Sequence, residues 1–231
     1  MDATIAPAAA LMGEPTRAAM LVALIEGRAL AAGELARRAG VSAATASAHL
    51  ARLLDGDLVT VIKQGRHRYY RLAGPDVAAA IEALSRLSPP APPPTGLRQV
   101  KARDALKRAR SCYDHLAGEA GVRLYASLAE RGTLVADLSG DRVQVKDARP
   151  FASLGIDLES LERQRRAFAR TCLDWTERAP HLAGALGAAL LDRMFVLDWL
   201  RRPTGGSRGL IVTADGRHGL AERLGCVFTE G

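Results

Sequence analysis

The chain has 231 residues, 48% of them hydrophobic, which is enough for two modest domains with buried cores or one larger domain. No apolar run approaches the length of a bilayer crossing, and Met1-Asp2 does not begin a basic, cleavable leader, so we expect a cytoplasmic protein with no membrane partner. Three cysteines, odd in number and far apart, argue against a disulfide framework, and most of the net charge of +7 comes from basic residues between positions 98 and 110.

The first helices are predicted before residue 40. Residues 1–12 are Ala-rich and suit a short helix that packs against a partner subunit. A second helix begins at Glu14-Pro15-Thr16, since Pro is tolerated in a first turn, and runs up to Gly27. A short support helix is predicted over residues 32–39, because Gly40 favours the left-handed conformation that closes a helix.

The next helix, predicted over residues 43–55, has the composition of a helix that enters the major groove of DNA. Ser42 is a good N-cap, because its hydroxyl can accept from free backbone N–H groups. One side carries the apolar residues Ala46, Leu50, Leu53 and Leu54. The other sides carry short or polar side chains that can approach base edges. The residues predicted to contact bases are Ser42, Thr45, Ser47 and His49, and Arg52 is predicted to contact a phosphate.

After Gly56 the pattern changes from helical to strand-like. Residues 58–62 are rich in β-branched side chains, Gln64-Gly65 is a turn dipeptide, and residues 66–72 return as RHRYYRL. This pattern predicts a two-stranded wing placed to meet a phosphate backbone or a minor groove. Its predicted phosphate contacts are Lys63, Arg66, His67 and Arg68.

Three segments together resemble the ArsR/SmtB family of bacterial metalloregulators and their non-metal relatives: GEPTRAAMLVAL, ELARRAGVSAATASAHLARLLDGDLV and QGRHRYYRL. They occur in order at workable spacings and cover roughly residues 11–87. The resemblance implies a winged helix-turn-helix homodimer that represses transcription and leaves its operator when an inducer binds.

A domain boundary follows this region. A helix predicted over residues 76–87 consists of Ala and Leu with few charges, and in the family it resembles the corresponding helix makes the dimer. The prolines of SPPAPPPTG then favour a polyproline spacer. We therefore predict a winged helix-turn-helix DNA-binding and dimerisation domain at residues 1–87, a Pro-rich linker at 88–97, and an effector-sensing or dimer-extending domain at 98–231.

The sequence of the C-terminal part predicts mostly helices, with a few short strands. The expected helices span residues 100–118, 122–131, 163–177, 181–200 and 213–224, with strands at 134–138, 143–146 and 208–212. This order loosely repeats that of the first half, so a second winged-helix-like fold is one interpretation. The predicted fold class is mainly α with small β-wings (α+β).

The first of these helices carries the basic excess of the chain. Two interpretations stay open, a second phosphate-contacting element or a solvated helix face. The residues are Arg98, Lys101, Arg103, Lys107, Arg108 and Arg110.

Neither familiar metal site of the resembling family can be assembled here. Where arsenite-binding members carry Cys-x-Cys after Glu-Leu, this chain has Ala36-Arg37-Arg38 after Glu34-Leu35. Where zinc sensors carry Asp-x-His and then His-x-x-Glu, Asp76 is followed by Val77-Ala78 and by no further matching ligand. The resemblance therefore cannot be used to infer a metal, and the cofactor is left open: a thiophilic metal or none.

A different group of candidate effector or metal residues lies in the C-terminal part: Cys112, His115, Cys172, Asp174, Trp175 and His181. A helix would put Cys112 and His115 on one face, and a neighbouring helix could supply Cys172. Such thiolates and imidazoles suit zinc or another thiophilic metal.

Three other interpretations of these residues stay open. The cysteines can be small core residues, as free cysteines usually are. A redox-sensing thiol would need a depressed pKa. Finally, an apolar pocket for an organic effector could be lined by aromatic and imidazole groups. Those groups are Tyr113, His115, Trp175, His181 and Trp199.

The predicted function is a sequence-specific DNA-binding transcriptional regulator, a homodimeric repressor released from its operator by an inducer in the C-terminal domain. Its partners would be double-stranded DNA, a second copy of the chain, and a metal or small-molecule inducer. The alternative is a thiol- or metal-dependent enzyme or redox sensor fused to a DNA-binding head. Against an enzyme, the chain has no nucleophile elbow, no phosphate-cradling Gly-rich loop and no HExxH motif.

Overall fold

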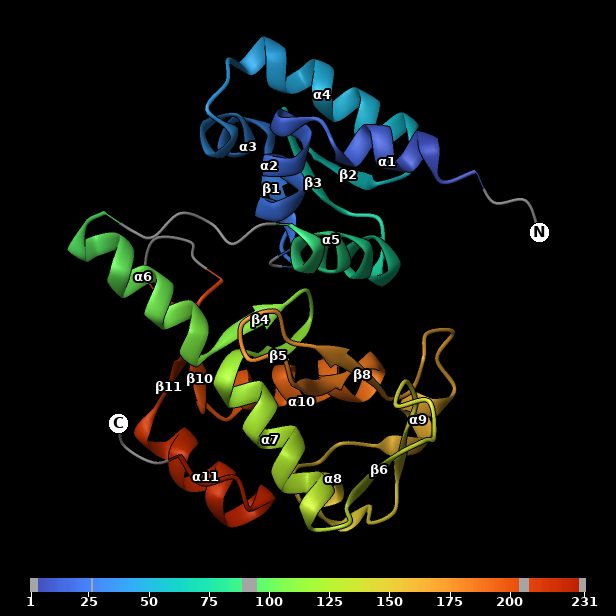
Figure 1. Cartoon of the computed structure of the whole chain (residues 1–231), viewed down its shortest axis with the longest axis vertical. Helices are drawn as coiled ribbons and strands as arrows, with labels where there is room; N and C mark the ends of the chain where they lie inside the picture. The colour runs from blue at the N-terminus through green and yellow to red at the C-terminus, as the bar shows by residue number, and fades with distance from the viewer. Residues whose placement is uncertain (1–3, 26, 89–94, 204–207, 229–231) are drawn as a thin grey trace. The chain divides into compact units, whose positions relative to one another are not determined.

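The structure is a computed structural model that describes residues 4–25, 27–88, 95–203 and 208–228. The chain divides into two compact units, an N-terminal unit up to residue 90 and a C-terminal unit from residue 91 (Figure 1). Both units combine helices with small antiparallel sheets, which confirms the predicted α+β class. Within the described ranges, no helix is long and apolar enough to cross a membrane.

The N-terminal unit has the order of elements expected of a winged helix-turn-helix. The strands described in this unit form one antiparallel sheet in the order β1-β3-β2. The elements are α1 (Ala6–Met12), α2 (Pro15–Leu24), β1 (Leu30–Ala31), α3 (Ala32–Ala39), α4 (Ala43–Asp55), β2 (Val59–Gln64), β3 (His67–Leu72) and α5 (Pro75–Leu87).

Local chemistry explains the turn between α3 and α4. Gly40 ends α3 with φ +68°, and its backbone N–H donates to the carbonyls of Ala36 and Arg37. The hydroxyl of Ser42 then accepts from the N–H of Thr45 and caps α4. Both predictions are confirmed. The core beneath this turn consists of fully buried residues of α2, α3 and α4, namely Met20, Leu21, Leu24, Leu35, Leu50 and Leu53.

The described residues of the C-terminal unit form four two-stranded antiparallel sheets, paired β4-β5, β6-β7, β8-β9 and β10-β11. Its helices are α6 (Leu97–Arg108), α7 (Gly118–Glu130), α8 (Arg149–Ser153), α9 (Leu158–Glu162), α10 (Gly184–Val196) and α11 (Ala214–Leu224). Its strands are β4 (Arg110–Cys112), β5 (His115–Ala117), β6 (Leu134–Ala136), β7 (Val143–Val145), β8 (Arg170–Leu173), β9 (Pro180–Ala183), β10 (Leu200–Arg201) and β11 (Ile211–Val212).

The predictions of two helices in this unit are wrong. The helix expected over residues 100–118 ends at Arg108, and the chain continues as the β4-β5 hairpin with Tyr113 at φ +57° in its turn. The helix expected over residues 163–177 is replaced by β8. The strands of the β4-β5 hairpin gain backbone hydrogen bonds and burial that propensity alone does not anticipate.

Other predictions in this unit are confirmed. The expected hairpin at 134–138 and 143–146 is present as β6 and β7. The last helix begins where Thr213 caps it through a hydrogen bond from the N–H of Gly216, and it ends at Leu224. The helix expected over residues 181–200 is present but shorter, as α10. Residues 89–94 of the predicted linker lie outside the described residues, and Leu97 already belongs to α6.

The C-terminal unit is built from two copies of one arrangement. Each copy is a hairpin, a helix and a second hairpin: β4-β5, α7 and β6-β7 in the first, β8-β9, α10 and β10-β11 in the second. The copies are interlocked, because α7 packs on β9 and α10 packs on β5. Strands β5 and β9 therefore meet in the middle of the unit.

Candidate nucleic-acid interface and buried cysteine–histidine site

The outer face of α4 carries short side chains open to solvent. Thr45 and Ser47 are exposed, as are the alanines at positions 43, 44 and 48. The Ser47 hydroxyl donates to the carbonyl of Ala43 at 2.9 Å, and the Ser42 and Thr45 hydroxyls lie 2.9 Å apart. These oxygens keep lone pairs for a partner, and no bulky side chain on this face would hold a base edge away.

His49 is placed differently from the other predicted base contacts. Its Nδ1 lies 3.2 Å from a carboxylate oxygen of Glu14, the N-cap of α2, and its side chain is 17% exposed. Desolvation raises the pKa of Glu14, but hydrogen bonds from the backbone N–H groups of Arg17 and Thr16, with His49 nearby, lower it to about 2. His49 thus contacts the rest of its own unit.

The wing projects four polar and cationic side chains into solvent. The register pairs Gln64 with His67, so the two-residue turn is Gly65-Arg66, one position later than the predicted Gln64-Gly65. Gly65 takes φ +57°, which suits such a hairpin turn. The exposed side chains are Lys63, Arg66, His67 and Arg68, and Arg52 at the end of α4 is exposed as well.

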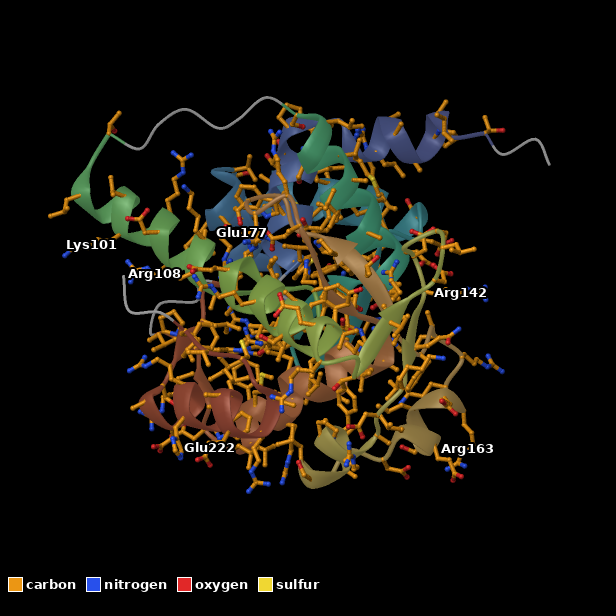
Figure 2. The ribbon with its side chains drawn as sticks, turned by 60° about the horizontal axis from the view of Figure 1, so that its bottom comes forward. Lys101, Arg108, Arg142, Arg163, Glu177 and Glu222 are labelled. Carbon is orange, nitrogen blue, oxygen red and sulfur yellow. The ribbon has the colours of Figure 1, made fainter. Side chains whose placement is uncertain are left out.

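The basic run predicted between residues 98 and 110 is divided by the fold. Lys101 and Arg108 extend from α6 into solvent (Figure 2). Arg110, in contrast, is on β4 and is buried in an ion pair with Asp174. Including Arg110 in an exposed basic helix face is therefore wrong, because the helix has already ended.

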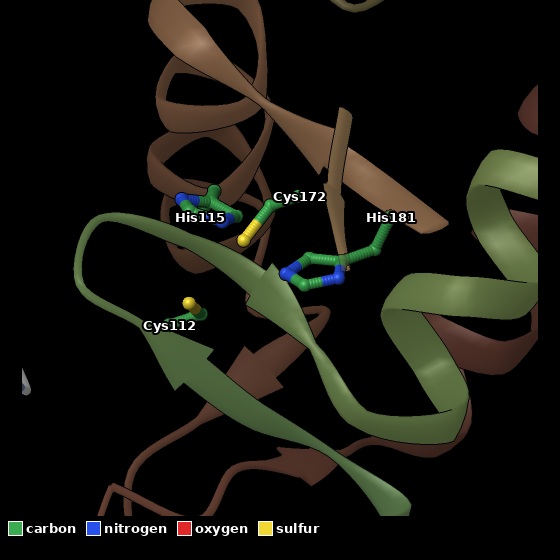
Figure 3. A group of neighbouring side chains, drawn as sticks. All are labelled: Cys112, His115, Cys172 and His181. Carbon is green, nitrogen blue, oxygen red and sulfur yellow. The ribbon is translucent and has the colours of Figure 1, made fainter. Parts of the chain in front are cut away.

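A second site lies inside the C-terminal unit. Cys112 pairs with His115 across the β4-β5 hairpin, and Cys172 pairs with His181 across the β8-β9 hairpin. One potential ligand atom from each of the four side chains lies within 4.8 Å of all the others, and the side chains converge from the two hairpins (Figure 3). Three of them are buried, and Cys172 is half-buried.

The histidine rings of this site are stacked, with centroids 5.1 Å apart. Nε2 of His115 and both ring nitrogens of His181 are buried, and among the described residues none has a hydrogen-bond partner. Burying a polar atom without a partner costs free energy. The arrangement therefore leaves donor atoms available for a ligand.

An aspartate stands beside each histidine. An oxygen of Asp114 lies 3.2 Å from Nδ1 of His115 and another lies 2.6 Å from Arg166. An oxygen of Asp174 lies 4.0 Å from Nδ1 of His181. Burial lowers the pKa of His115, but the hydrogen bond with Asp114 and the proximity of the Cys172 sulfur outweigh it and raise that pKa.

The two thiols inside the site differ from Cys226. A hydrogen bond with Cys112, together with the imidazoles of His115 and His181, holds the pKa of Cys172 far below its ordinary value despite burial. Cys226 is buried in the hydrophobic core, which raises its pKa to about 11. A thiolate is the form of cysteine that binds metals and reacts with oxidants, so Cys172 is better suited to such chemistry than Cys226.

Asp174 and Trp175 are near the site without joining it. Both oxygens of Asp174 are occupied by Arg110, by Thr176 and by the backbone N–H groups of Gly118 and Glu177. The Trp175 ring faces outward and receives the guanidinium of Arg110 at 4.9 Å.

The predicted organic-effector pocket is not formed as expected. Trp199 is in the hydrophobic core, where its ring covers Gly219, while Trp175 is partly exposed. A groove of about 1030 Å³ is found elsewhere in the unit, between α6, α7, β11 and α11. None of the predicted effector residues lines it; its walls include Lys101, Arg108, Ile211, Arg217 and Phe228.

An internal repeat in the sequence indicates the two hairpins that carry the cysteines and histidines. RSCYDHLAG at 110–118 and RTCLDWTERAPHLAG at 170–184 share Arg, Cys and Asp at the same spacing and end in the same HLAG. Their glycines Gly118 and Gly184 both begin a helix with positive φ. A search for internal repeats would have shown two equivalent Cys–His pairs, whereas helical spacing alone misplaced the first one.

The comparisons decide the family. The chain is 44% identical over 225 residues to the uncharacterized HTH-type transcriptional regulator YdfF of Bacillus subtilis (strain 168), covering 97% of this chain and 98% of that protein. This chain belongs to the HTH-type transcriptional regulators. A helix-turn-helix domain model matches residues 12–62 of this regulator. The predicted helix-turn-helix regulator with an additional C-terminal region is therefore confirmed.

Solved structures are also similar to part of the regulator. Reduced HlyU from Vibrio cholerae is 33% identical over 36% of this chain and 85% of its own, with a TM-score of 0.33. The transcriptional repressor BigR from Xylella fastidiosa is 23% identical over 38% of this chain and 88% of its own, with a TM-score of 0.35. The homodimeric winged helix-turn-helix DNA-binding domain Mb0332 from Mycobacterium bovis is 30% identical over 36% of this chain and 75% of its own, with a TM-score of 0.31.

Proposed function

We propose that this regulator is a homodimeric repressor that binds operator DNA through α4 and the wing and is released when an inducer binds in the C-terminal unit. The observation that carries the DNA contact is the exposure of Thr45 and Ser47 on a capped helix with a buried opposite stripe. Small hydroxylated side chains allow a helix to approach base edges, and the cations of the wing supply phosphate contacts.

Dimerisation is supported by the apolar surface of α5. Leu84 and Leu87 are 46% and 84% exposed on this helix, although Leu is normally buried. An exposed apolar helix face is a common interaction surface, and a second copy would also give the twofold symmetry that matches two operator half-sites. We propose α5 as the dimer helix.

Inducer binding is supported by the buried cysteine–histidine site. Its donor atoms converge in the C-terminal unit, whereas the residues proposed to contact DNA are all in the N-terminal unit. The same geometry favours binding over catalysis. Catalytic zinc sites keep one position open for substrate, but here four protein side chains converge and three are buried.

The test of DNA binding uses fluorescence anisotropy with the promoter upstream of the regulator's own gene and a scrambled duplex of equal length. We expect tight binding to the promoter at low ionic strength and much weaker binding to the scrambled duplex. Equal binding to both duplexes would contradict sequence-specific recognition, and no binding to either would contradict the DNA-binding function.

The test of dimerisation uses sedimentation velocity of a Leu84→Glu/Leu87→Glu variant. We expect the wild type to sediment as a dimer and the variant as a monomer, because two charges would be buried at the α5 interface. Leu138→Glu is the matched control, since Leu138 is a fully exposed leucine in the C-terminal unit. A monomeric wild type would contradict the homodimer, and a dimeric double variant would contradict α5 as its interface.

A further inference from the structure

We propose that Cys112, His115, Cys172 and His181 bind one thiophilic divalent metal ion, Zn²⁺ before others, which joins the two copies of the repeated hairpin–helix arrangement. Each copy supplies one cysteine and one histidine, from facing positions of its first hairpin. Only the step that connects this ion to DNA release rests on the proposed function.

The donor set matches zinc chemistry. Two thiolates and two imidazoles are a common tetrahedral zinc set, whereas oxygen-preferring cations such as Mg²⁺ select carboxylates. With bond lengths of about 2.0–2.3 Å, the ligand atoms of a tetrahedral site are about 3.3–3.8 Å apart. The four ligand atoms here lie within 4.8 Å of one another, so side-chain movements of about 1 Å bring them to bonding positions.

The buried nitrogens point to a missing partner. The His115 and His181 side chains are 6% and 1% exposed, and Nε2 of each has no hydrogen-bond partner among the described residues. Buried polar groups are normally satisfied, and a metal ion would satisfy both nitrogens at once. This burial distinguishes the site from the solvent-exposed histidine and acidic residues of α11.

A neighbouring carboxylate orients the His115 ring as metal sites require, and a second carboxylate lies near the His181 ring. Asp114 lies 3.2 Å from Nδ1 of His115, and Asp174 lies 4.0 Å from Nδ1 of His181. Metal-binding histidines usually donate their second ring N–H to such a group, which fixes the tautomer and the ring orientation. This contact leaves Nε2 of His115 for the metal, while both ring nitrogens of His181 remain available.

Two glycines let the copies come close enough to share an ion. A Cβ on Gly121 would lie 2.4 Å from the carbonyl oxygen of Leu116 and 3.6 Å from Cβ of His181. A Cβ on Gly187 would lie 2.6 Å from the carbonyl oxygen of Leu182 and 3.2 Å from Cβ of His115. Each helix therefore packs closely behind the metal-binding histidine of the other copy.

The first experiment measures metal in the full-length protein. Protein purified without chelator is analysed by elemental mass spectrometry, and metal-free protein is titrated with Co²⁺ alone. We expect one zinc ion per chain, and with Co²⁺ the visible bands of a tetrahedral ion together with thiolate-to-metal charge transfer. Metal-free protein that gives no such spectrum with reduced thiols would overturn the proposal.

Variants locate the site. Cys112→Ser and His181→Asn are each expected to abolish stoichiometric binding, and Cys226→Ser is the control because Cys226 is a buried thiol outside the cluster. Asp114→Asn keeps all four ligands and is expected to weaken affinity about 10–100-fold. Retained binding in Cys112→Ser and His181→Asn, or its loss in Cys226→Ser with an intact fold, would overturn the assignment.

A measurement on the wild type covers the case in which the ligand variants do not fold. Mass spectrometry of alkylated protein tells whether Cys112 and Cys172 are joined in a disulfide, which would require their sulfurs to close to about 2.05 Å. A metal-free protein with this disulfide would overturn the metal site in favour of a redox pair. Reduced thiols that a mercurial reagent modifies with release of one zinc ion would support it.

Operator binding is then compared with and without the ion. If the ion is the inducer, Zn²⁺ weakens operator affinity, and operator DNA weakens Zn²⁺ affinity by the same factor. Unchanged operator affinity would overturn the regulatory step and leave the metal site intact. Loss of DNA binding in both forms, with one zinc ion per chain, would instead contradict the proposed function.

Discussion

Arg110 and Asp174 form an ion pair 2.8 Å long in the interior of the C-terminal unit, with side chains 1% and 0% exposed. Arg110 begins the first copy of the repeated arrangement and Asp174 follows β8 of the second, so the pair joins the two copies. The Arg110 guanidinium and hydrogen bonds from Thr176 and Gly118 outweigh desolvation and lower the pKa of Asp174. The buried, charged form of Asp174 is therefore stable only while these partners are present.

Replacing Arg110 with Met should therefore destabilise the protein by about 3–5 kcal/mol, because it leaves the Asp174 charge buried without its cation. Chemical unfolding at neutral pH measures this. The double variant Arg110→Met/Asp174→Asn should recover part of the loss. Arg163→Ala removes an exposed arginine from a surface pair with Glu159 and should change stability very little. Similar losses in the free energy of unfolding for Arg110→Met and Arg163→Ala would show that the buried ion pair contributes no more to stability than the surface pair does.

The wing prediction concerns salt. Arg66→Ala should weaken binding to promoter and scrambled duplexes alike and reduce the slope of log K against log salt by about 0.9, the value of one phosphate contact. Arg163→Ala changes the net charge equally but alters the C-terminal unit, so its slope should equal that of the wild type. If the Arg66→Ala and wild-type slopes are the same, this arginine does not contact a phosphate.

Thr45→Ala should act on discrimination. Because Thr45 is exposed on the outer face of α4, its loss should leave the fold intact and remove a hydrogen bond to a base edge. The difference in affinity between the promoter and the scrambled duplex should shrink by about 1–3 kcal/mol, with little change in the salt slope. A uniform loss on both duplexes would place Thr45 on the phosphate backbone instead.

Ser42 allows capping and DNA contact to be separated. Its hydroxyl accepts from the N–H of Thr45, so Ser42→Ala should destabilise the N-terminal unit by about 1 kcal/mol. Ser42→Asp keeps a capping oxygen and should be as stable as the wild type, while its negative charge weakens binding to DNA. Thermal unfolding and anisotropy measure the two effects. An aspartate variant with undiminished DNA affinity would mean that the start of α4 stays away from the duplex.

Glu14 gives the N-terminal unit a pH dependence with a definite sign. Its pKa is lowered from 4.5 to about 2 in the folded state, so its contribution to stability is complete above 4.5 and is lost as the pH falls toward 2. Glu14→Gln removes this contribution. The difference in melting temperature between wild type and variant should be largest at neutral pH and should disappear as the pH falls through 2. A difference that is constant across this range would mean that the carboxylate charge does not matter.

In the N-terminal unit, the sequence by itself determined most of the structure. Gly40, Ser42 and the apolar stripe at Ala46, Leu50 and Leu53 act on neighbouring residues, and the turn and capped helix formed where predicted. Local hydrogen bonds and helical periodicity need no information from distant parts of the chain. The strand β1 was missed, because it is two residues long and exists only through its pairing with Tyr69 and Tyr70.

In the C-terminal unit, the tertiary structure decided what the sequence left open. Cys112 and His115 are three positions apart, a spacing that fits one face of a helix and also the two ends of a two-residue turn. In the structure they face each other across such a turn. Cys112 and Cys172 are 60 positions apart and still lie close together, because α7 packs on the hairpin strand β9 and α10 packs on the hairpin strand β5. This proximity depends on the close packing of the two copies. Local patterns of residues along the chain do not specify that packing.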